Sequence, residues 1–429
     1  MDLMIRRSGW MLLPVLTLLM TGCPPQAEKV APPVTTENTK QESGKGSLPA
    51  PETSAPVATP ADDPAVVETL QAAKVQFKRN GEGQVIAADC KFAEITDEQL
   101  KLFQRLPHLK SLSLENSKVT NEGLKFLEFL PQLTELGLRR STQIDDAGLE
   151  SLKFLPHLQR LLLLYTRVTS DGLKHLVPLH DLKLLDLRGC TQIGDAGLAH
   201  LEGLKNLVDV KLRSYSVTDA GMKSLAKLPR LRVLSLEDCG VGDAGMAELT
   251  SLKDLRSLNV MRTVVGDDGL ASFAEMKLVE LSLRDTAVTG IGLDALAAAR
   301  DTLLDLDLSE TRIGNDGVGH IAQFQKLQNL NLWNGSLDDD GLKLLAGLTE
   351  LKELNLESCR MITSASGEQL AKFSKLATLN LAETGIDNSV LEALNGLGNL
   401  KLLVLARSGV TEDAGQKFEQ DHPGCTVKF

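Results

Sequence analysis

The sequence predicts an α/β solenoid in which short parallel strands line one face and short helices line the other. Two observations predict this fold class. A leucine pattern, L-x-x-L-x-L, occurs thirteen times from Leu109 onward, at intervals of 23 to 25 residues. After each copy comes a polar stretch and then a motif close to V/I-T-D-x-G-L. A fixed period of this length is typical of stacked repeats, because one unit cannot bury its own apolar face.

Each repeat is expected to begin with a strand. Leu185 and Leu187 are two residues apart, and side chains at this spacing point to the same side of a strand. The residues between and just after them point to the other side. By the same alternation, Leu258 is expected to be buried and Asn259 to be exposed.

A short helix is expected after each strand. Leu198, Leu201 and Leu204 have helical spacing. The position two residues after the V/I residue holds Asp, Asn, Ser or Gly in twelve of the thirteen copies. These residue types favour a helix N-cap, so we expect the helix to start there. The thirteen occupants are Asn121, Asp146, Ser170, Asp195, Asp219, Asp243, Asp267, Gly290, Asn315, Asp339, Ser364, Asn388 and Glu412.

The two kinds of element require the array to curve. Parallel strands pack about 4.8 Å apart, whereas helices need roughly 8–10 Å. The strands must therefore lie on the inside of the bend. The exposed face of the sheet is expected to form a concave surface roughly 60 Å long.

Segments at both ends of the repeats are expected to cover the open core. Residues 65–108 are predicted to form an N-terminal cap with a helix over 66–73, a hairpin turning at Asn80-Gly81 and one more helix start near Ile95. Residues 109–415 contain the repeats. Residues 416–429 are predicted to form a C-terminal cap, with residues 425–429 closing the last strand edge.

The repeats resemble the leucine-rich-repeat family from residue 109 onward. The copy L-D-L-R-G-C-T-Q-I-G-D-A-G-L around Cys190 is similar to the cysteine-containing subtype that is best known beside F-box domains, and Cys239 and Cys359 occupy the matching position. Other repeats depart from that subtype in nearby slots, with Asn116, Thr263, Thr286, Thr311 and Thr384. The resemblance implies a right-handed solenoid that binds a macromolecule on its concave face. No F-box-like segment is recognised before the repeats, so a ubiquitin-adaptor role is not expected.

The first residues predict an exported lipoprotein. Arg6 and Arg7 precede an apolar run from Trp10 to Met20, which is shorter than the roughly 20 residues that span a bilayer. The M-T-G-C sequence ending at Cys23 resembles a bacterial lipobox. It implies a signal peptide over residues 1–22 and lipidation of Cys23. The alternatives are a cleaved signal with an unmodified cysteine and an uncleaved signal anchor.

Residues 23–64 are expected to form a disordered, lipidated tether. The segment is rich in Pro, Thr, Ala, Glu and Ser and has almost no large apolar residues, so it cannot bury a core. Pro24 follows the cysteine, where some inner-membrane lipoproteins carry Asp, and this favours the outer membrane. We therefore expect a lipid-anchored protein of the cell envelope, at the outer membrane or in the periplasm or on the cell surface.

Composition and motifs favour binding over catalysis. The net charge of −11 argues against a nucleic-acid partner. The G-x-G-x-x-G match at Gly240 lies in an ordinary repeat, and the run Asp338–Asp340 lies where acidic residues suit a helix dipole. We expect no cofactor, no metal site and no catalytic residues. Cys190 and Cys239 lie two repeats apart, near 10 Å, which is beyond disulfide reach, so they are predicted to be small buried hydrophobes.

The candidate partner-binding residues lie in or beside the column that follows the last leucine of each strand. Aromatic residues and arginines are the usual anchors of interfaces. The candidates are Arg139, Leu164, Tyr165, Arg188, Arg213, Tyr215, Met261, Arg284 and Trp333. The alternative is that the arginines pair laterally with Asp186, Asp209 or Glu237. Acidic residues dominate this side in repeats eight to eleven, at Glu280, Asp285, Asp305, Asp307, Glu310, Glu353 and Glu357, so the surface is expected to grade from basic to acidic.

Together these features predict a membrane-anchored, non-catalytic binding module of a bacterial cell envelope. We expect a monomer that holds a protein ligand on the concave sheet. The alternative is a structural envelope component that self-associates or packs on wall polymer, and a third possibility is an enzyme or enzyme accessory. Self-association that depends on concentration would favour the structural role. Hydrolase activity lost on mutating one polar residue would favour the enzyme.

Overall fold

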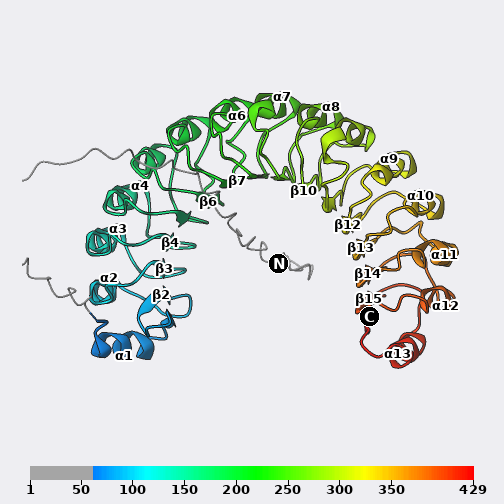
Figure 1. Cartoon of the computed structure of the whole chain (residues 1–429), viewed down its shortest axis with the longest axis horizontal. Helices are drawn as coiled ribbons and strands as arrows, with labels where there is room; N and C mark the ends of the chain where they lie inside the picture. The colour runs from blue at the N-terminus through cyan, green and yellow to red at the C-terminus, as the bar shows by residue number, and fades with distance from the viewer. Residues whose placement is uncertain (1–60) are drawn as a thin grey trace, which may run out of the picture. The chain divides into compact units, whose positions relative to one another are not determined.

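The computed structural model describes residues 61–429, which form one curved solenoid (Figure 1). The described strands make a single sheet whose sixteen members follow chain order from β1 to β16. Strands line the inside of the curve and helices the outside, which confirms the predicted fold class. The predicted signal peptide, the lipidation site at Cys23 and nearly all of the tether lie outside the described residues.

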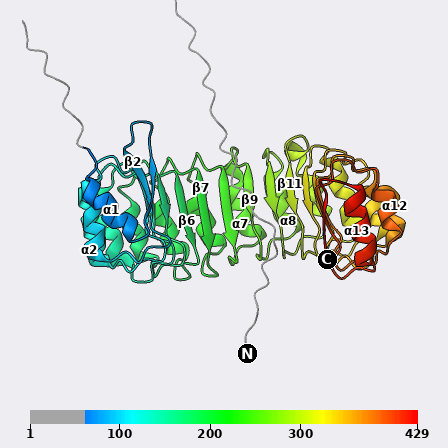
Figure 2. The ribbon, with the colours of Figure 1, turned by 90° about the horizontal axis from the view of Figure 1, so that it is seen from below.

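The repeat strands are short and pair in parallel with matching leucine register. Leu258 pairs with Leu281 on one side and Leu234 on the other. The strands are β3 (Ser111–Ser113), β4 (Glu135–Gly137), β5 (Arg160–Leu162), β6 (Leu184–Arg188), β7 (Asp209–Arg213), β8 (Val233–Glu237), β9 (Ser257–Asn259), β10 (Glu280–Ser282), β11 (Asp305–Asp307), β12 (Asn329–Asn331), β13 (Glu353–Asn355), β14 (Thr378–Asn380) and β15 (Leu402–Val404). Figure 2 shows the strands in the middle of the solenoid, among them β6, β7 and β9, side by side.

The predicted strand phase is correct for the core. Leu185 and Leu258 are at most 1% exposed, and the leucines of successive repeats form one continuous hydrophobic core. Asn259 differs from the expectation. It is half-buried, and its side-chain carbonyl accepts the N–H of Met261 at 2.9 Å. The side chain of Asn259 is therefore used to hold the backbone just after its own strand.

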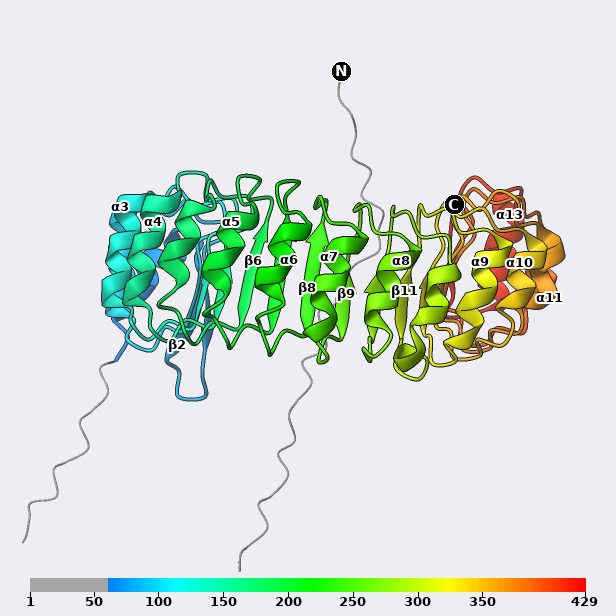
Figure 3. The same cartoon turned by 90° about the horizontal axis from the view of Figure 1, so that it is seen from above.

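Helices cover the convex side, where Figure 3 shows them in a row. The α-helices of the repeats and caps are α2 (Asp97–Leu100), α3 (Asn121–Leu124), α4 (Asp146–Leu149), α5 (Asp195–Leu198), α6 (Asp219–Leu225), α7 (Asp243–Glu248), α8 (Asp267–Leu270), α9 (Asn315–Gly319), α10 (Asp339–Leu344), α11 (Gly367–Leu370), α12 (Val390–Leu394) and α13 (Glu412–Asp421). Further 3-10 segments are Lys101–Arg105, Lys125–Phe129, Glu150–Phe154, Asp171–Leu176, Ala199–Leu201, Leu249–Ser251, Ala271–Phe273, Ile291–Ala295, Ala297–Ala299, His320–Gln323 and Ser364–Ser366.

The predicted N-cap position is correct for the 3-10 segments that start after Ser170 and Gly290, and it is wrong by one residue for the α-helices of the repeats. In α6 the N-cap is Thr218, and Asp219 is the first helical residue. The acidic side chain has another use, which Asp195 illustrates. Its Oδ1 accepts the N–H of Thr218 in the next repeat at 2.8 Å, and its Oδ2 accepts the Thr218 hydroxyl at 2.6 Å. The residue predicted as a cap therefore supports the first turn of its neighbour.

This contact recurs along the solenoid, and we call it the inter-repeat ladder. Its side-chain-to-backbone pairs are Asp97–Thr120, Asn121–Asp145, Asp146–Thr169, Ser170–Gly194, Asp195–Thr218, Asp219–Gly242, Asp243–Gly266, Asp267–Thr289, Asn315–Asp338, Asp339–Thr363, Ser364–Asp387 and Asn388–Thr411. It is interrupted at Gly290, where φ is 107° and no side chain is available. The ladder also explains the glycine of the motif. A Cβ atom on Gly221 would lie 2.5 Å from Oδ1 of Asp195.

Further elements lie before the first repeat strand and after the last one. Before the repeats lie α1 (Pro64–Ala72) and the antiparallel pair β1 (Gln76–Arg79) and β2 (Val85–Asp89), and β2 continues in parallel into β3. Asp63 caps α1, and Asp62 accepts the N–H of Val85 at 2.6 Å. The cap therefore includes Asp62, Asp63 and Pro64, which the sequence-based prediction placed in the tether. At the far end β16 (Thr426–Lys428) pairs in parallel with β15.

The cysteines of the repeats are buried and free, as expected for small core residues. Cys190, Cys239 and Cys359 are at most 2% exposed. Burial raises the pKa of the Cys239 and Cys359 thiols to about 12, so both stay protonated at neutral pH. The Cys190 thiol also donates to the carbonyl of Leu163 at 3.0 Å, in the preceding repeat. The position of Cys190 in the repeat therefore favours a small side chain that can donate a hydrogen bond.

Candidate partner-binding site on the concave face

The candidate residues are positioned by the end of each strand and by the turn that follows. Leu187 points into the core, so Arg188, the next residue of β6, faces the concave side. The chain then turns through a residue at positive φ, such as Tyr165 at 57°, Gly189 at 80° or Asp238 at 50°. The side chains of the turn therefore lie beside the column of residues that follow the last leucine of each strand.

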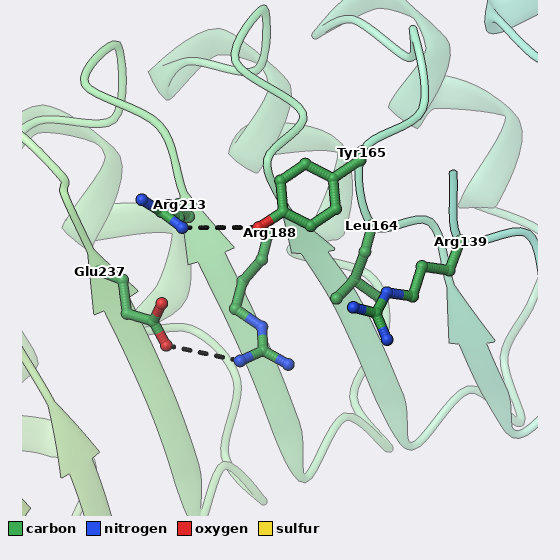
Figure 4. A pocket seen from close by; sticks show the side chains of 6 residues that line it. All are labelled: Arg139, Leu164, Tyr165, Arg188, Arg213 and Glu237. Atoms are coloured by element: carbon green, nitrogen blue, oxygen red, sulfur yellow. Dashed lines mark hydrogen bonds and ion pairs between the residues drawn. The ribbon is translucent and has the colours of Figure 1, made fainter. Parts of the chain in front are cut away.

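Five of the predicted residues meet in one small pocket of about 160 Å³. Figure 4 shows Leu164 and Tyr165 between the three arginine side chains, with Glu237 at one side. The lining residues are Arg139, Leu164, Tyr165, Arg188, Arg213 and Glu237. We call this cavity the small pocket.

Arg188 is held mainly by its own strand. Its Nε and Nη2 atoms donate to the Asp186 carboxylate at 3.1 and 2.8 Å. Its Nη1 atom reaches Glu237 only at 3.5 Å. The lateral pairing that the sequence offered as an alternative is therefore present, and it fixes the orientation of the guanidinium group.

Arg213 is held by the following repeat. Its Nε donates to Asp238 at 2.5 Å, and its Nη1 lies 3.5 Å from the Tyr165 hydroxyl. Arg262 also donates to Asp238 through Nε and Nη2. Hydrogen bonds and charge from Arg262 and Arg213 hold the pKa of Asp238 below its ordinary value, against the effect of burial.

Arg139 is the least satisfied arginine of the pocket. Its Nη1 lies 3.6 Å from a carboxylate oxygen of Glu115. Its Nε is buried and has no hydrogen-bond partner. A buried donor without an acceptor is unfavourable, and the Nη1 contact is longer than a normal hydrogen bond, so the Arg139 guanidinium group is the least firmly held of the three.

A larger pocket of about 600 Å³ adjoins the first and shares Tyr165 and Arg213 with it. The Tyr165 ring lies over Gly189, where a Cβ atom would be 2.3 Å from the ring. Tyr215 is 75% exposed on the rim of this cavity. The lining residues are Tyr165, Gly189, Thr191, Arg213, Ser214, Tyr215, Asp238 and Arg262. We call this cavity the large pocket.

Three predicted residues lie apart from these pockets. Arg284 stacks over the Trp333 ring at 4.8 Å and pairs with Glu310 at 2.8 Å. Met261 lines neither pocket. The predicted column therefore splits into one cluster with two cavities and a separate arginine–tryptophan pair.

Acidic residues gather farther along the sheet, as the sequence predicted. Glu280, Asp305, Asp307 and Glu353 lie on β10, β11 and β13. Burial raises the pKa of Asp305 to about 6. A hydrogen bond from Asn329 opposes that rise, and the negative charges of Glu280, Asp307 and Glu353 add to it.

Two residues that organise the cluster are not among those predicted from the sequence. Asp238 and Arg262 lie at the positive-φ turn position, one residue beyond the arginine column. In an earlier repeat this turn position holds the predicted residue Tyr165. The sequence did not indicate their role, because only the structure shows that a turn residue with positive φ projects beside the end of the strand. The motif at Gly240 and the run from Asp338 serve the fold, since the N–H of Gly242 donates to Asp219 and Asp338 is the N-cap of α10.

Residues 61–429 offer no group of His, Cys, Asp or Glu that could hold a metal ion. Within the same range, no helix is long and apolar enough to cross a membrane.

Comparison with known families agrees with the repeat pattern. The family described as Leucine Rich repeat matches residues 105–127, 179–201, 227–249 and 251–274. The fold and this pattern define the class of protein: the chain has the leucine-rich-repeat solenoid fold and is similar to that family. Leucine-rich-repeat domains are typically non-catalytic modules that bind proteins. No curated protein matches the chain.

Two bacterial structures share the fold. An internalin from Listeria monocytogenes has 21% identity and a TM-score of 0.56, over 87% of this chain and 98% of the internalin chain. A leucine-rich-repeat protein from Leptospira interrogans has 18% identity and a TM-score of 0.53, over 78% of this chain and 88% of that chain. At these identities the similarity concerns the fold alone.

Proposed function

We propose that this protein is a lipid-anchored, protein-binding module of a bacterial cell envelope. In this proposal Cys23 carries the lipid, residues 23–61 form the tether, and the concave face holds the partner. The lipobox-like sequence and the composition of the tether support the anchor. The observation that carries the binding role is the pair of adjoining pockets, which brings together Tyr165, Arg188, Arg213 and Tyr215.

The chemistry of this cluster is that of an interface anchor. Aromatic rings and arginines supply most of the binding energy in protein interfaces. Here the arginines are held by carboxylates on one side, so little side-chain entropy remains to be lost on binding. The cluster by itself is smaller than an interface of about 800 Å² per partner, and the rest of the concave sheet would supply the surround.

Arg213→Ala and Tyr215→Ala are expected to weaken partner binding by about 1–3 kcal/mol each. The fold should survive the Arg213 change, because Asp238 keeps its two contacts with Arg262. The measurement is capture of envelope proteins by the full chain and by each variant, followed by titration of the captured partner.

Glu357→Ala is the control, since this residue follows β13 in the acidic half. It should leave affinity nearly unchanged. If both cluster variants bind normally while Glu357→Ala binds poorly, the partner surface lies at the other end of the solenoid.

Cys23→Ala tests the anchor. The variant should leave the membrane fraction or stall before signal cleavage, because the thiol that accepts the lipid is missing. Fractionation of cells with detection of the chain measures this. Normal processing together with continued membrane association would contradict lipidation at Cys23.

A further inference from the structure

The small pocket presents hydrogen-bond donors that lack good acceptors. The Nε atom of Arg139 is buried without any partner. The Nη1 atoms of Arg188 and Arg213 make only 3.5 Å contacts, with Glu237 and with the Tyr165 hydroxyl. Contacts of this length are at the weak end of hydrogen bonding. Three positive groups thus face one cavity with unused capacity.

Their strong contacts all point elsewhere. Asp186 holds Arg188 at 2.8 Å and Asp238 holds Arg213 at 2.5 Å, and neither carboxylate lines the small pocket. Each of these two guanidinium groups is therefore positioned through one edge and presents its other edge to the cavity. Such preorganised, charged donors suit a carboxylate better than a neutral acceptor.

Glu237 is the only acidic residue among the six that line the small pocket. Its Oε1 atom receives long contacts from Arg188, Ser235 and Asn259, at 3.5, 3.3 and 3.3 Å. None of these contacts is short, so the carboxylate is loosely held. Glu237 acts here as an internal counter-anion, and a ligand carboxylate would compete with it.

The size of the cavities restricts the ligand. The small pocket, at about 160 Å³, is below the range of roughly 300–1,000 Å³ that is usual for small-molecule sites. It holds about five water molecules at roughly 30 Å³ each, which is the scale of one side chain. The adjoining large pocket, lined in part by Tyr165 and Tyr215, has room for the residues that flank it.

We propose that the small pocket binds the carboxylate of one acidic side chain in a peptide segment of the partner, while flanking residues occupy the large pocket. This inference rests on the proposed function, since it names the group by which the partner is held. The segment carries an isolated acidic residue. Asp238 lines the large pocket, and Glu280 and Asp305 lie farther along the sheet, so a polyanion would be repelled.

The test uses the full chain with arginine side chains labelled with ¹⁵N, and three probes. These are acetyl-Leu-Glu-Leu-amide, its uncharged match acetyl-Leu-Gln-Leu-amide, and inorganic phosphate. The glutamate peptide should shift the Nε–H resonances of Arg139, Arg188 and Arg213 saturably. The glutamine peptide should bind at least about tenfold more weakly, because its uncharged amide cannot make the charge-assisted contact. Single Arg→Lys variants assign the resonances.

Two variants act in opposite directions. Glu237→Gln removes the internal negative charge but keeps an acceptor oxygen, so it should tighten binding of the glutamate peptide severalfold. Arg139→Gln should weaken it. Arg300→Gln is the matched control, because Arg300 follows the 3-10 segment Ala297–Ala299 and contacts Gln323.

The inference is overturned if the glutamate peptide gives no shift at these arginines, or if the glutamine peptide binds equally well. It is also overturned if Glu237→Gln does not tighten binding, or if phosphate binds as tightly as the peptide, which would indicate a site for free oxyanions. Partner capture that needs Arg213 and Tyr215, without any response to the glutamate peptide, would leave the proposed function standing and this inference rejected. The reverse pattern would retain the carboxylate site and reject the proposed partner surface.

Discussion

Leu185→Ala is expected to destabilise the solenoid by about 2–5 kcal/mol. Leu185 is fully buried in β6, where it pairs with Leu161 and Val210 of the neighbouring strands. Truncation removes buried apolar surface and leaves a cavity that three repeats must share. Because a repeat is stabilised chiefly by its neighbours, the defect should weaken both interfaces. The midpoint of urea unfolding measures the effect.

Leu184→Ala is a matched control in the same strand. Leu184 has the same side chain but faces the concave surface and is only half-buried. Its truncation should cost roughly 1 kcal/mol or less, since much of the side chain already contacts water. Equal shifts of the midpoint for the two variants would contradict the strand phase.

The strand phase was predictable because it depends on local alternation. A side chain two residues away faces the same way, so Leu185 and Leu187 could be assigned to the core from the sequence alone. The fixed period of the repeats then predicted the stacking and the direction of curvature. Neither inference needs knowledge of a contact between distant residues.

The helix start was misassigned because its main contact is not local. Asp219 has the residue type of an N-cap, and within its own repeat nothing argues against that role. Its actual hydrogen bond goes to Gly242, in the next repeat, at 2.7 Å. Propensity describes a segment in isolation, so it could not detect an acceptor that serves the neighbouring repeat.

The candidate site was predicted in part for a similar reason. The column containing Arg139, Arg188 and Arg213 follows directly from strand register, and these residues do share a pocket. Arg284 is separated from them along the sheet and pairs with Trp333. The contact by which Asp238 orients Arg213 was visible only in the structure. Asp238 adopts a positive φ although it is not a glycine, so the sequence did not mark this turn position.

The inter-repeat ladder leads to the second large stability effect. Asp195→Ala is expected to cost about 1–3 kcal/mol, because the N–H of Thr218 loses its acceptor. Gly221→Ala should cost a similar amount, about 1–3 kcal/mol, through overpacking. Its new Cβ would lie 2.5 Å from Oδ1 of Asp195 and 2.8 Å from Cδ1 of Leu198. The carboxylate cannot move away without stretching its own hydrogen bonds to Thr218.

The two changes are therefore expected to be coupled. In the Asp195→Ala background the carboxylate is gone, so Gly221→Ala should cost less than it does alone. The contact with Leu198 remains, and the saving should be about 0.5–3 kcal/mol. Gly203→Ala is the control, since nothing lies within 4 Å of its Cβ position, and it should change stability by no more than about 0.5 kcal/mol. Urea unfolding of the wild type, the two single variants and the double variant measures the coupling. Strictly additive costs would mean that the motif's glycine is required for a reason other than the aspartate of the preceding repeat.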